Sequence, residues 1–231
     1  MIWMAGFTVI PLLMVFYYGL TDRSGAFTLA NILAIGSSEH LKALWLSLAL
    51  AGVSTVICLL LAYPLALILR KRHIGKGSFV VFIFILPMWM NFLLRTMAWQ
   101  TLLEKNGVIN TFLTILHLPN IAIINTPAAI ILGMVYNFLP FMVLPIYNTL
   151  AKIDDNVINA ARDLGADNYQ TLTKILLPLS VPGIVSGITM VFVPALTTFV
   201  ISNLLGGSKI LLIGNVIEQE FTKGRNWNLG A

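Results

Sequence analysis

The chain has 231 residues, of which 58% are hydrophobic and 10% are charged, with a net charge of +5. An ordinary soluble domain carries about 25% charged residues, so lipid must be the solvent for most of this surface. The positive charge does not indicate a nucleic-acid-binding protein, because basic and aromatic residues are not interleaved as in proteins on which bases stack. The single cysteine, Cys58, lies in an apolar run, which excludes a disulfide or a cysteine-based metal site within the chain.

Five stretches are long and apolar enough to cross the hydrocarbon layer as helices of about 20 residues. They are residues 1–20, 43–69, 78–98, 127–150 and 179–204. The first lacks the basic leading region and the small-residue cleavage site of a signal peptide, so it is interpreted as a span. The sequence shows neither an internal repeat nor a soluble domain. It therefore predicts one all-α membrane domain over residues 1–231.

The loops between these spans predict the orientation across the membrane. Residues 70–76 include four basic residues and no acidic one, and such short basic loops are cytoplasmic. Strict alternation then places the N-terminus and residues 151–178 in the cytoplasm. It places residues 21–42, 99–126 and 205–231, with the C-terminus, on the outer side.

Patterns typical of catalysis and of metal binding are absent from the sequence. The three histidines are far apart along the chain, which argues against a zinc site. A phosphate-binding loop requires a glycine five residues before its Gly-Lys pair, and Arg70 occupies that place before Gly75-Lys76. We therefore expect neither enzyme activity nor a bound cofactor or metal, and any energy from ATP must come through a partner.

The most specific pattern is the polar segment between the last two predicted spans. Asp154 and Asp155 can cap the start of a helix, and Gly165 suits a left-handed turn at its end. Asp167 or Asn168 can then cap a second helix. The segment therefore predicts two short helices joined by a glycine turn. On this pattern alone, an ordinary amphipathic connector lying on the membrane remains an equal alternative to a functional element.

The spacing within this segment resembles the signature E-A-A-x3-G-x9-I-x-L-P of binding-protein-dependent ABC importer permeases. The matching positions are Asn159, Ala160, Ala161, Gly165, Ile175, Leu177 and Pro178. Asn159 departs from the signature, which has glutamate there. In that family this loop is the coupling helix that docks on the ATPase subunit. The resemblance therefore implies that residues 152–178 are an ATPase-coupling loop.

A second stretch, residues 86–110, is similar to the spermidine/putrescine permeases of that family. It contains L-P-x-W-x-N, R-T-x-A-W and G-x-I-N at the spacing found in those proteins. This resemblance implies a polyamine as the substrate and a type I ABC importer permease fold. Members of this group have six transmembrane helices, of which five are visible here, so we expect that the chain is truncated before the last helix.

The resemblance also implies where the protein acts and with which partners. It implies a multi-pass protein of the inner (plasma) membrane that forms the translocation pathway with a second permease subunit. The other implied partners are an ATP-binding cassette ATPase, which hydrolyses the ATP, an extracytoplasmic substrate-binding protein and membrane lipid. Nucleic acid is not among them.

Polar or aromatic side chains within the predicted spans are the candidates for the substrate pathway. They are Trp89, Asn91, Tyr136 and Asn137. Arg95 lies near the outer end of its span, where a long side chain can reach the headgroups. We interpret Arg95 as a structural or gate-locking residue rather than as part of a cation pathway, although an intramembrane charge often marks a functional site.

An ion-coupled secondary transporter or a channel is the alternative function. Such a protein requires acidic or histidine side chains within its spans to bind a proton or an ion. All nine acidic residues lie outside the predicted spans, which disfavours this alternative. A membrane scaffold without transport activity is a third interpretation, and it leaves the spaced Ala-Ala-x3-Gly pattern unexplained.

Overall fold

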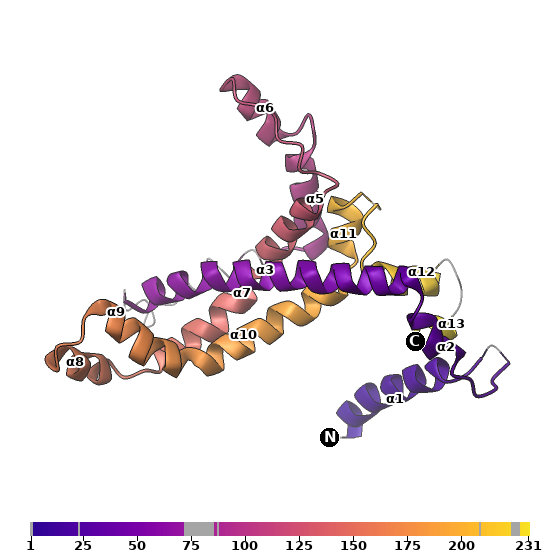
Figure 1. Cartoon of the computed structure of the whole chain (residues 1–231), viewed down its shortest axis with the longest axis horizontal. Coiled ribbons are helices and arrows are strands. Elements are labelled where there is room, and N and C mark those ends of the chain that lie inside the picture. Colours follow the sequence, from indigo (N-terminus) through magenta and orange to yellow (C-terminus); the bar gives the residue numbers. More distant parts are fainter. Residues whose placement is uncertain (1, 23, 72–85, 87, 208, 223–226) are drawn as a thin grey trace.

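The computed structural model describes residues 2–22, 24–71, 86, 88–207, 209–222 and 227–231. Within these ranges the regular structure is helical (Figure 1), apart from one bridge that pairs Thr21 with Phe27. The helices are α1 (Ile2–Gly19), α2 (Ala30–Ile35), α3 (Ser38–Lys71), α5 (Phe92–Leu103), α6 (Val108–Ile115), α7 (Pro127–Ala151), α8 (Asp155–Asp163), α9 (Asn168–Thr171), η2 (Leu172–Leu176, a π-helix), α10 (Leu177–Thr197), α11 (Val200–Leu205), α12 (Ile213–Thr222) and α13 (Trp227–Gly230). The predicted all-α class is confirmed.

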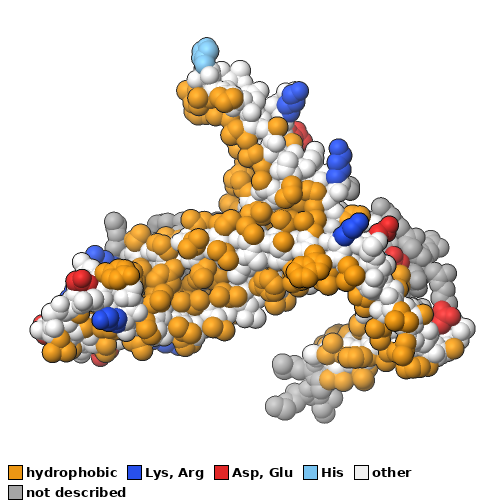
Figure 2. All heavy atoms as spheres, viewed as in Figure 1, with side chains coloured by type: hydrophobic (Ala, Val, Ile, Leu, Met, Phe, Trp, Pro, Cys, Tyr) orange, Lys and Arg blue, Asp and Glu red, His pale blue; other side chains and the backbone are white. Residues whose placement is uncertain are grey.

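Three helices in this part of the chain are long and apolar enough to cross a membrane. They are α3, α7 and the continuous helix Asn168–Thr197, which joins α9, η2 and α10. In Figure 1, α3, α7 and α10 lie along one another, and α5 and α6 project from them. On the face drawn in Figure 2, charged side chains lie toward the ends of this three-helix body, and the surface between them is largely hydrophobic. Such an apolar band is what the hydrocarbon layer requires.

The predicted spans differ in how far the structure supports them. Those over residues 43–69 and 127–150 lie within α3 and α7 and are confirmed as helices of sufficient length. The first predicted span coincides with α1, an apolar helix of 18 residues from Ile2 to Gly19, which is slightly shorter than the about 20 residues of a full crossing. Residues 78–85 and 87 of the span over 78–98 and residues 72–76 of the basic run lie outside the described residues, and α5 begins within that span at Phe92. The number of five spans therefore remains a prediction.

The span predicted over residues 179–204 is wrong at its far end. Helix α10 stops at Thr197, and α11 begins only at Val200. Thr198 has extended backbone angles, φ −67° and ψ 134°, so the helix is broken there. The hydropathy of Val200–Leu205 continues that of α10, and a hydropathy pattern cannot show where the chain turns within an apolar run.

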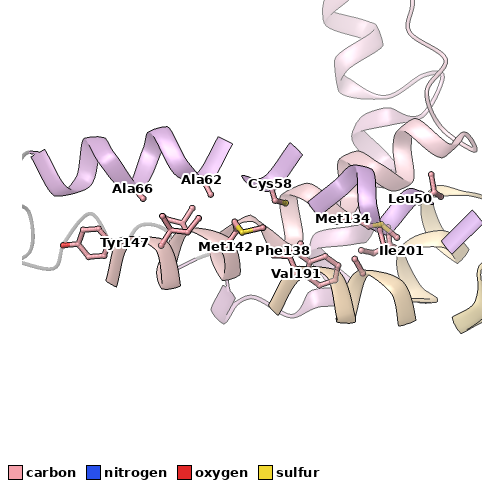
Figure 3. Packing of buried hydrophobic residues seen from close by; sticks show 14 of the residues in the cluster. Leu50, Cys58, Ala62, Ala66, Met134, Phe138, Met142, Tyr147, Val191 and Ile201 are labelled. Atoms are coloured by element: carbon pink, nitrogen blue, oxygen red, sulfur yellow. The ribbon is translucent and has the colours of Figure 1, made fainter. Parts of the chain in front are cut away.

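Small side chains on α3 allow α7 to approach it closely. They recur every three or four residues and are completely buried: Ser47, Ala51, Ser54, Cys58, Ala62 and Ala66. Figure 3 shows part of this row facing the larger side chains of Met134, Met142 and Tyr147 on α7. Membrane helices associate through such small-residue faces, because lipid provides no hydrophobic force that would drive them together.

Helix α10 contacts α7 through two glycines four residues apart. A Cβ built on Gly183 would lie 2.7 Å from the carbonyl oxygen of Pro145. A Cβ built on Gly187 would lie 2.7 Å from Sδ of Met142. A Cβ at position 183 would clash with the backbone of α7, whereas one at position 187 would first displace the flexible Met142 side chain. Gly183 and Gly187 form a G-x-x-x-G packing face of the kind used between membrane helices.

We predict that Gly183→Leu destabilises the protein by forcing α10 away from α7. Overpacking of a close contact costs about 1–3 kcal/mol, so the midpoint of thermal unfolding of the purified protein in detergent should fall. Gly52→Leu on α3 is the matched control, because no atom lies within 4 Å of a Cβ built there. An equal fall for both variants would show that α7 and α10 do not depend on this contact.

Candidate functional site

The connection between α7 and α10 extends beyond the three-helix body as two short helices, α8 and α9 (Figure 1). Asp154 caps α8, because its carboxylate accepts a hydrogen bond of 2.9 Å from the backbone N–H of Asn156. Of the two aspartates predicted as caps, Asp154 is therefore confirmed. Asp155 is instead the first residue of α8.

Helix α8 ends in a turn built on Gly165, as predicted. The φ angle of Gly165 is +86°, and its N–H donates to the carbonyl of Arg162 at 2.9 Å. The N–H of Ala166 donates to the carbonyl of Ala161 at 3.0 Å. These two bonds form a Schellman motif, in which a residue of positive φ ends the helix. The Ala161-x3-Gly165 spacing therefore has a structural basis. The Ala161 carbonyl accepts one bond of the motif, and Gly165, four residues later, takes the positive φ that glycine adopts freely.

Helix α9 starts with a complete capping box. The carboxylate of Asp167 accepts from the N–H of Gln170 at 2.6 Å, and Oε1 of Gln170 accepts from the N–H of Asp167 at 3.3 Å. The cap is therefore Asp167 and not Asn168. Hydrogen bonds fix both ends of the turn between α8 and α9. The corner is therefore stiffer than is usual for a segment that projects from a helical body.

The remaining signature residues lie where α9 continues into α10. Ile175 is half-buried within the π-helix η2, and Leu177 and Pro178 are exposed at the start of α10. Single-turn π-helices occur frequently at functional sites. Asn159 and Ala160 are exposed on α8, and Ala161 is half-buried. The structure thus distributes the signature over one outlying corner and the helix that leads from it into the body.

Large apolar side chains point outward at this corner. Leu164 is 89% exposed and Tyr169 is 73% exposed, whereas Ile158 is buried toward the body. Apolar side chains gathered on a projecting corner are typical of a surface that contacts another protein. The corner therefore has both the stiffness and the surface chemistry of a docking element.

Arg70, at the end of α3, ties this corner to the body. Its Nη2 donates to the carbonyl oxygen of Ile153 at 3.0 Å and pairs with Oδ1 of Asp155 at 2.9 Å. No local pattern in the sequence indicates this contact, because the two charged residues are 85 positions apart. The available signal was the predicted alternation, which places residues 70–76 and 151–178 on the same side of the membrane.

The two polar pathway candidates, Asn91 and Asn137, form hydrogen bonds with the backbone of their own helices. Asn91 caps α5, its Oδ1 accepting from the N–H of Leu93 at 2.8 Å. Asn137 is 1% exposed and donates to the carbonyl of Gly133 at 2.9 Å within α7. Its Oδ1 has no hydrogen-bond partner among the described residues. Asn91 therefore has a structural function, and neither asparagine gains support as a pathway residue.

The aromatic pathway candidates are more accessible. Tyr136 is 39% exposed and its ring meets that of Trp99 edge-on, with centroids 5.2 Å apart. Trp89 is 73% exposed. Arg95, in contrast, is only 6% exposed, and its Nε and Nη1 have no hydrogen-bond partner in the described part of the chain. The expectation that Arg95 extends to the headgroups is therefore wrong in this structure.

Relatives of known name are similar to this chain over nearly its whole length. Residues 1–222 match the family described as "Binding-protein-dependent transport system inner membrane component". The spermidine/putrescine transport system permease protein PotB of Haemophilus influenzae is 39% identical over 238 residues, which cover 99% of this chain and 83% of that protein. PotB of Escherichia coli is 39% identical, over 99% of this chain and 86% of its own length.

The inner membrane ABC transporter permease protein YdcU of Escherichia coli is 32% identical over 82% of this chain and 65% of that protein. Among solved structures, a chain of the bacterial alginate ABC transporter in complex with an alginate pentasaccharide-bound periplasmic protein aligns with a TM-score of 0.80. That alignment covers 99% of this chain and 82% of the other, at 19% identity. It shows that the fold is shared.

We predict that Arg70→Gln loosens α8 without unfolding the body. Asp155 is 60% exposed, so solvent screening limits the ion pair to about 1 kcal/mol, and the bond to the Ile153 carbonyl adds about 1 kcal/mol. Amide hydrogen exchange over residues 153–163 should therefore become faster. Lys71→Gln, a neighbouring exposed cation, is the control. Unchanged exchange in Arg70→Gln would show that this contact does not hold the corner.

Proposed function

The chain belongs to the family of binding-protein-dependent transport system inner membrane components, and from that membership we propose that it is the permease subunit of an ATP-driven polyamine importer. The matches to the family model and to the PotB proteins confirm the family and the membrane location that we expected from the sequence. The substrate class is supported by the names of the PotB relatives, which are 39% identical over 99% of this chain. The G-x-I-N and R-T-x-A-W patterns within residues 86–110 point the same way.

The Schellman turn at Gly165 is the observation that carries the proposed coupling mechanism. Residues 152–178 dock on an ATP-binding cassette ATPase, with Leu164 and Tyr169 presented to that partner. The corner continues without interruption into the helix Asn168–Thr197. A displacement of the docked corner therefore moves α10 as a rigid extension, which is how a partner that hydrolyses ATP drives the membrane helices.

A second permease subunit and an extracytoplasmic binding protein complete the proposed assembly. Helix α1 lies apart from the three-helix body in Figure 1, and its Trp3 and Phe7 are 77% and 69% exposed. Such apolar faces suit a second permease and lipid. The ion-coupled alternative is disfavoured further, because α7 and α10 contain no acidic residue and the only one in α3 is Glu39 in its first turn.

We predict that the complete complex, reconstituted in liposomes with its ATPase, second permease and binding protein, takes up labelled spermidine or putrescine only with ATP. Leaving out the ATPase is the control. Uptake that continues without the ATPase would support an ion-coupled transporter instead. ATP-dependent uptake of another solute, without competition by polyamines, would retain the importer and reject the substrate class.

We predict that Gly165→Val uncouples ATP hydrolysis from uptake. No atom lies within 4 Å of a Cβ built on Gly165, so the effect arises from the backbone alone. Holding a β-branched residue at positive φ costs about 1–3 kcal/mol, which should misdirect α9. The measurements are ATPase co-purification and substrate-stimulated hydrolysis, with membrane insertion unchanged.

The control is Gly165→Asn, because asparagine tolerates the left-handed region. Ala161→Asp should impair coupling as Gly165→Val does, whereas Asn159→Glu, which supplies the usual signature residue, should be tolerated. Normal assembly and normal coupling in both Gly165→Val and Ala161→Asp would mean that this loop is only a connector.

A further inference from the structure

Arg95 is a charged side chain that is enclosed within the protein. It lies on α5, which packs against α7 and α11, and only 6% of its surface is exposed. Its Nε and Nη1 are completely enclosed and have no hydrogen-bond partner among the described residues. The third nitrogen, Nη2, is not enclosed in this way, so it is the atom through which another molecule can reach the guanidinium group.

A buried guanidinium group requires a negatively charged partner. Arginine stays charged in proteins, so it cannot avoid the cost of burial by releasing a proton. Taking a charge out of water without a partner is costly in free energy, and buried charges in native proteins are therefore paired. Within a membrane, charged side chains face protein or water and pair with one another.

No carboxylate side chain of this chain is the partner of Arg95. All nine acidic residues belong to the ranges that the structure describes, and the positions outside those ranges hold no Asp or Glu. Between described residues, an ion pair joins Arg70 to Asp155, and none joins an acidic residue to Arg95. The counter-ion therefore comes from another molecule.

The neighbouring amide on α7 does not replace a counter-ion. The rings of Phe92 and Phe138 have centroids 6.4 Å apart. Those of Trp99 and Tyr136 are 5.2 Å apart. These contacts place the middle of α5 against the part of α7 that carries Asn137. Oδ1 of Asn137 is itself buried and has no hydrogen-bond partner in the described part of the chain, so it accepts no bond from the guanidinium group.

The surface of α5 beside Arg95 indicates which molecule provides the counter-ion. Leu93, Leu94 and Met97 are exposed there, and permanent interfaces between subunits bury apolar faces of this kind. An apolar face suits a subunit that lies in the same membrane better than a binding protein that docks from water. The ATPase is proposed to contact the α8–α9 corner, and lipid phosphates lie outside the hydrocarbon layer.

We propose that Arg95 is an assembly residue, whose guanidinium group forms a buried ion pair with a carboxylate of the second permease subunit. The inference rests on the proposed assembly of two permeases. It assigns a contact between them to the α5 face formed by Leu93, Leu94, Arg95 and Met97. A paired Arg95 also adds no net positive charge beside a pathway for cations.

Arg95→Met tests the proposal through two effects of opposite sign. In the chain without its partner, Met replaces an unpaired buried charge, so the midpoint of thermal unfolding in detergent should rise by about 2–4 °C. In the complex, Met leaves the carboxylate of the second permease unpaired. The affinity for the purified second permease, measured by titration in nanodiscs, should therefore fall about thirtyfold or more.

The matched control is Lys105→Met, because Lys105 is an exposed cation shortly after α5. It should change neither the unfolding midpoint nor the affinity. A lower midpoint in Arg95→Met, with unchanged affinity, would show that Arg95 acts within its own chain and would overturn the proposal. If anionic lipid raised the midpoint of the unmodified chain but not of Arg95→Met, a headgroup phosphate would be the counter-ion, which would also overturn it.

Charge exchange identifies the partner carboxylate. Arg95→Glu should prevent co-purification of the second permease, and one Asp→Lys or Glu→Lys change in that subunit should restore it. If only such a change in the binding protein restored co-purification, the second permease would be rejected as the source. Arg95→Met introduces no charge, so its two measurements decide the question if Arg95→Glu does not insert into the membrane.

The outcomes also separate this inference from the proposed function. If the unmodified chain binds a second permease and Arg95→Met binds it equally well, only the ion pair fails. If the unmodified chain binds no second permease, the proposed assembly fails and the ion pair fails with it. Weaker binding by Arg95→Met together with a higher unfolding midpoint of the isolated chain supports both.

Discussion

Helices in a bilayer gain no free energy from hiding apolar side chains from water, so α3, α7 and α10 depend on close contact to stay together. The row of completely buried small residues on α3 and the two glycines on α10 provide that contact against α7. Helix α3 also holds the two ends of the three-helix body in place. Arg70 binds the α8–α9 corner at one end of this helix, and Ser47 binds the start of α12 at the other.

The helix that starts at α9 is continuous at the corner and is interrupted near α12. The two ends of the body therefore have different mechanical properties. The chain runs as one helix from Asn168 to Thr197, so motion at the corner is transmitted along the body. At Thr198 the helix breaks, and the buried Asn215 fixes the following segment separately. The helix that carries the corner is therefore joined to α11 and α12 through a break and not through continuous helix.

The parts of this arrangement that depend on local chemistry could be predicted from the sequence. The caps at Asp154 and Asp167 and the turn at Gly165 involve residues a few positions apart, where one side chain or one positive φ decides the conformation. The apolar run over 127–150 predicted helix α7 to within a residue at each end, and in the structure Thr126 caps its start. These features need no knowledge of the rest of the fold.

The parts that depend on tertiary contact could not be predicted in this way. Arg70 and Asp155 are 85 residues apart, and no local pattern joins them. The break at Thr198 interrupts a run whose hydropathy stays high on both sides, so a hydropathy window passes over it. Glu218 lies beside the end of α10 only because α12 packs there. In each case, distant segments meet through the packing of α3, α7 and α10.

The central claim is that the corner formed by α8 and α9 is the point of contact with an ATPase. The most direct measurement places a photoreactive benzophenone-maleimide on Leu164→Cys, in a Cys58→Ala background, within the assembled complex. The account predicts that illumination joins this chain to the ATPase subunit, while the same probe on Trp45→Cys, an exposed position of α3, does not. Absence of a cross-link from position 164 in a complex that still hydrolyses ATP and takes up substrate would contradict it.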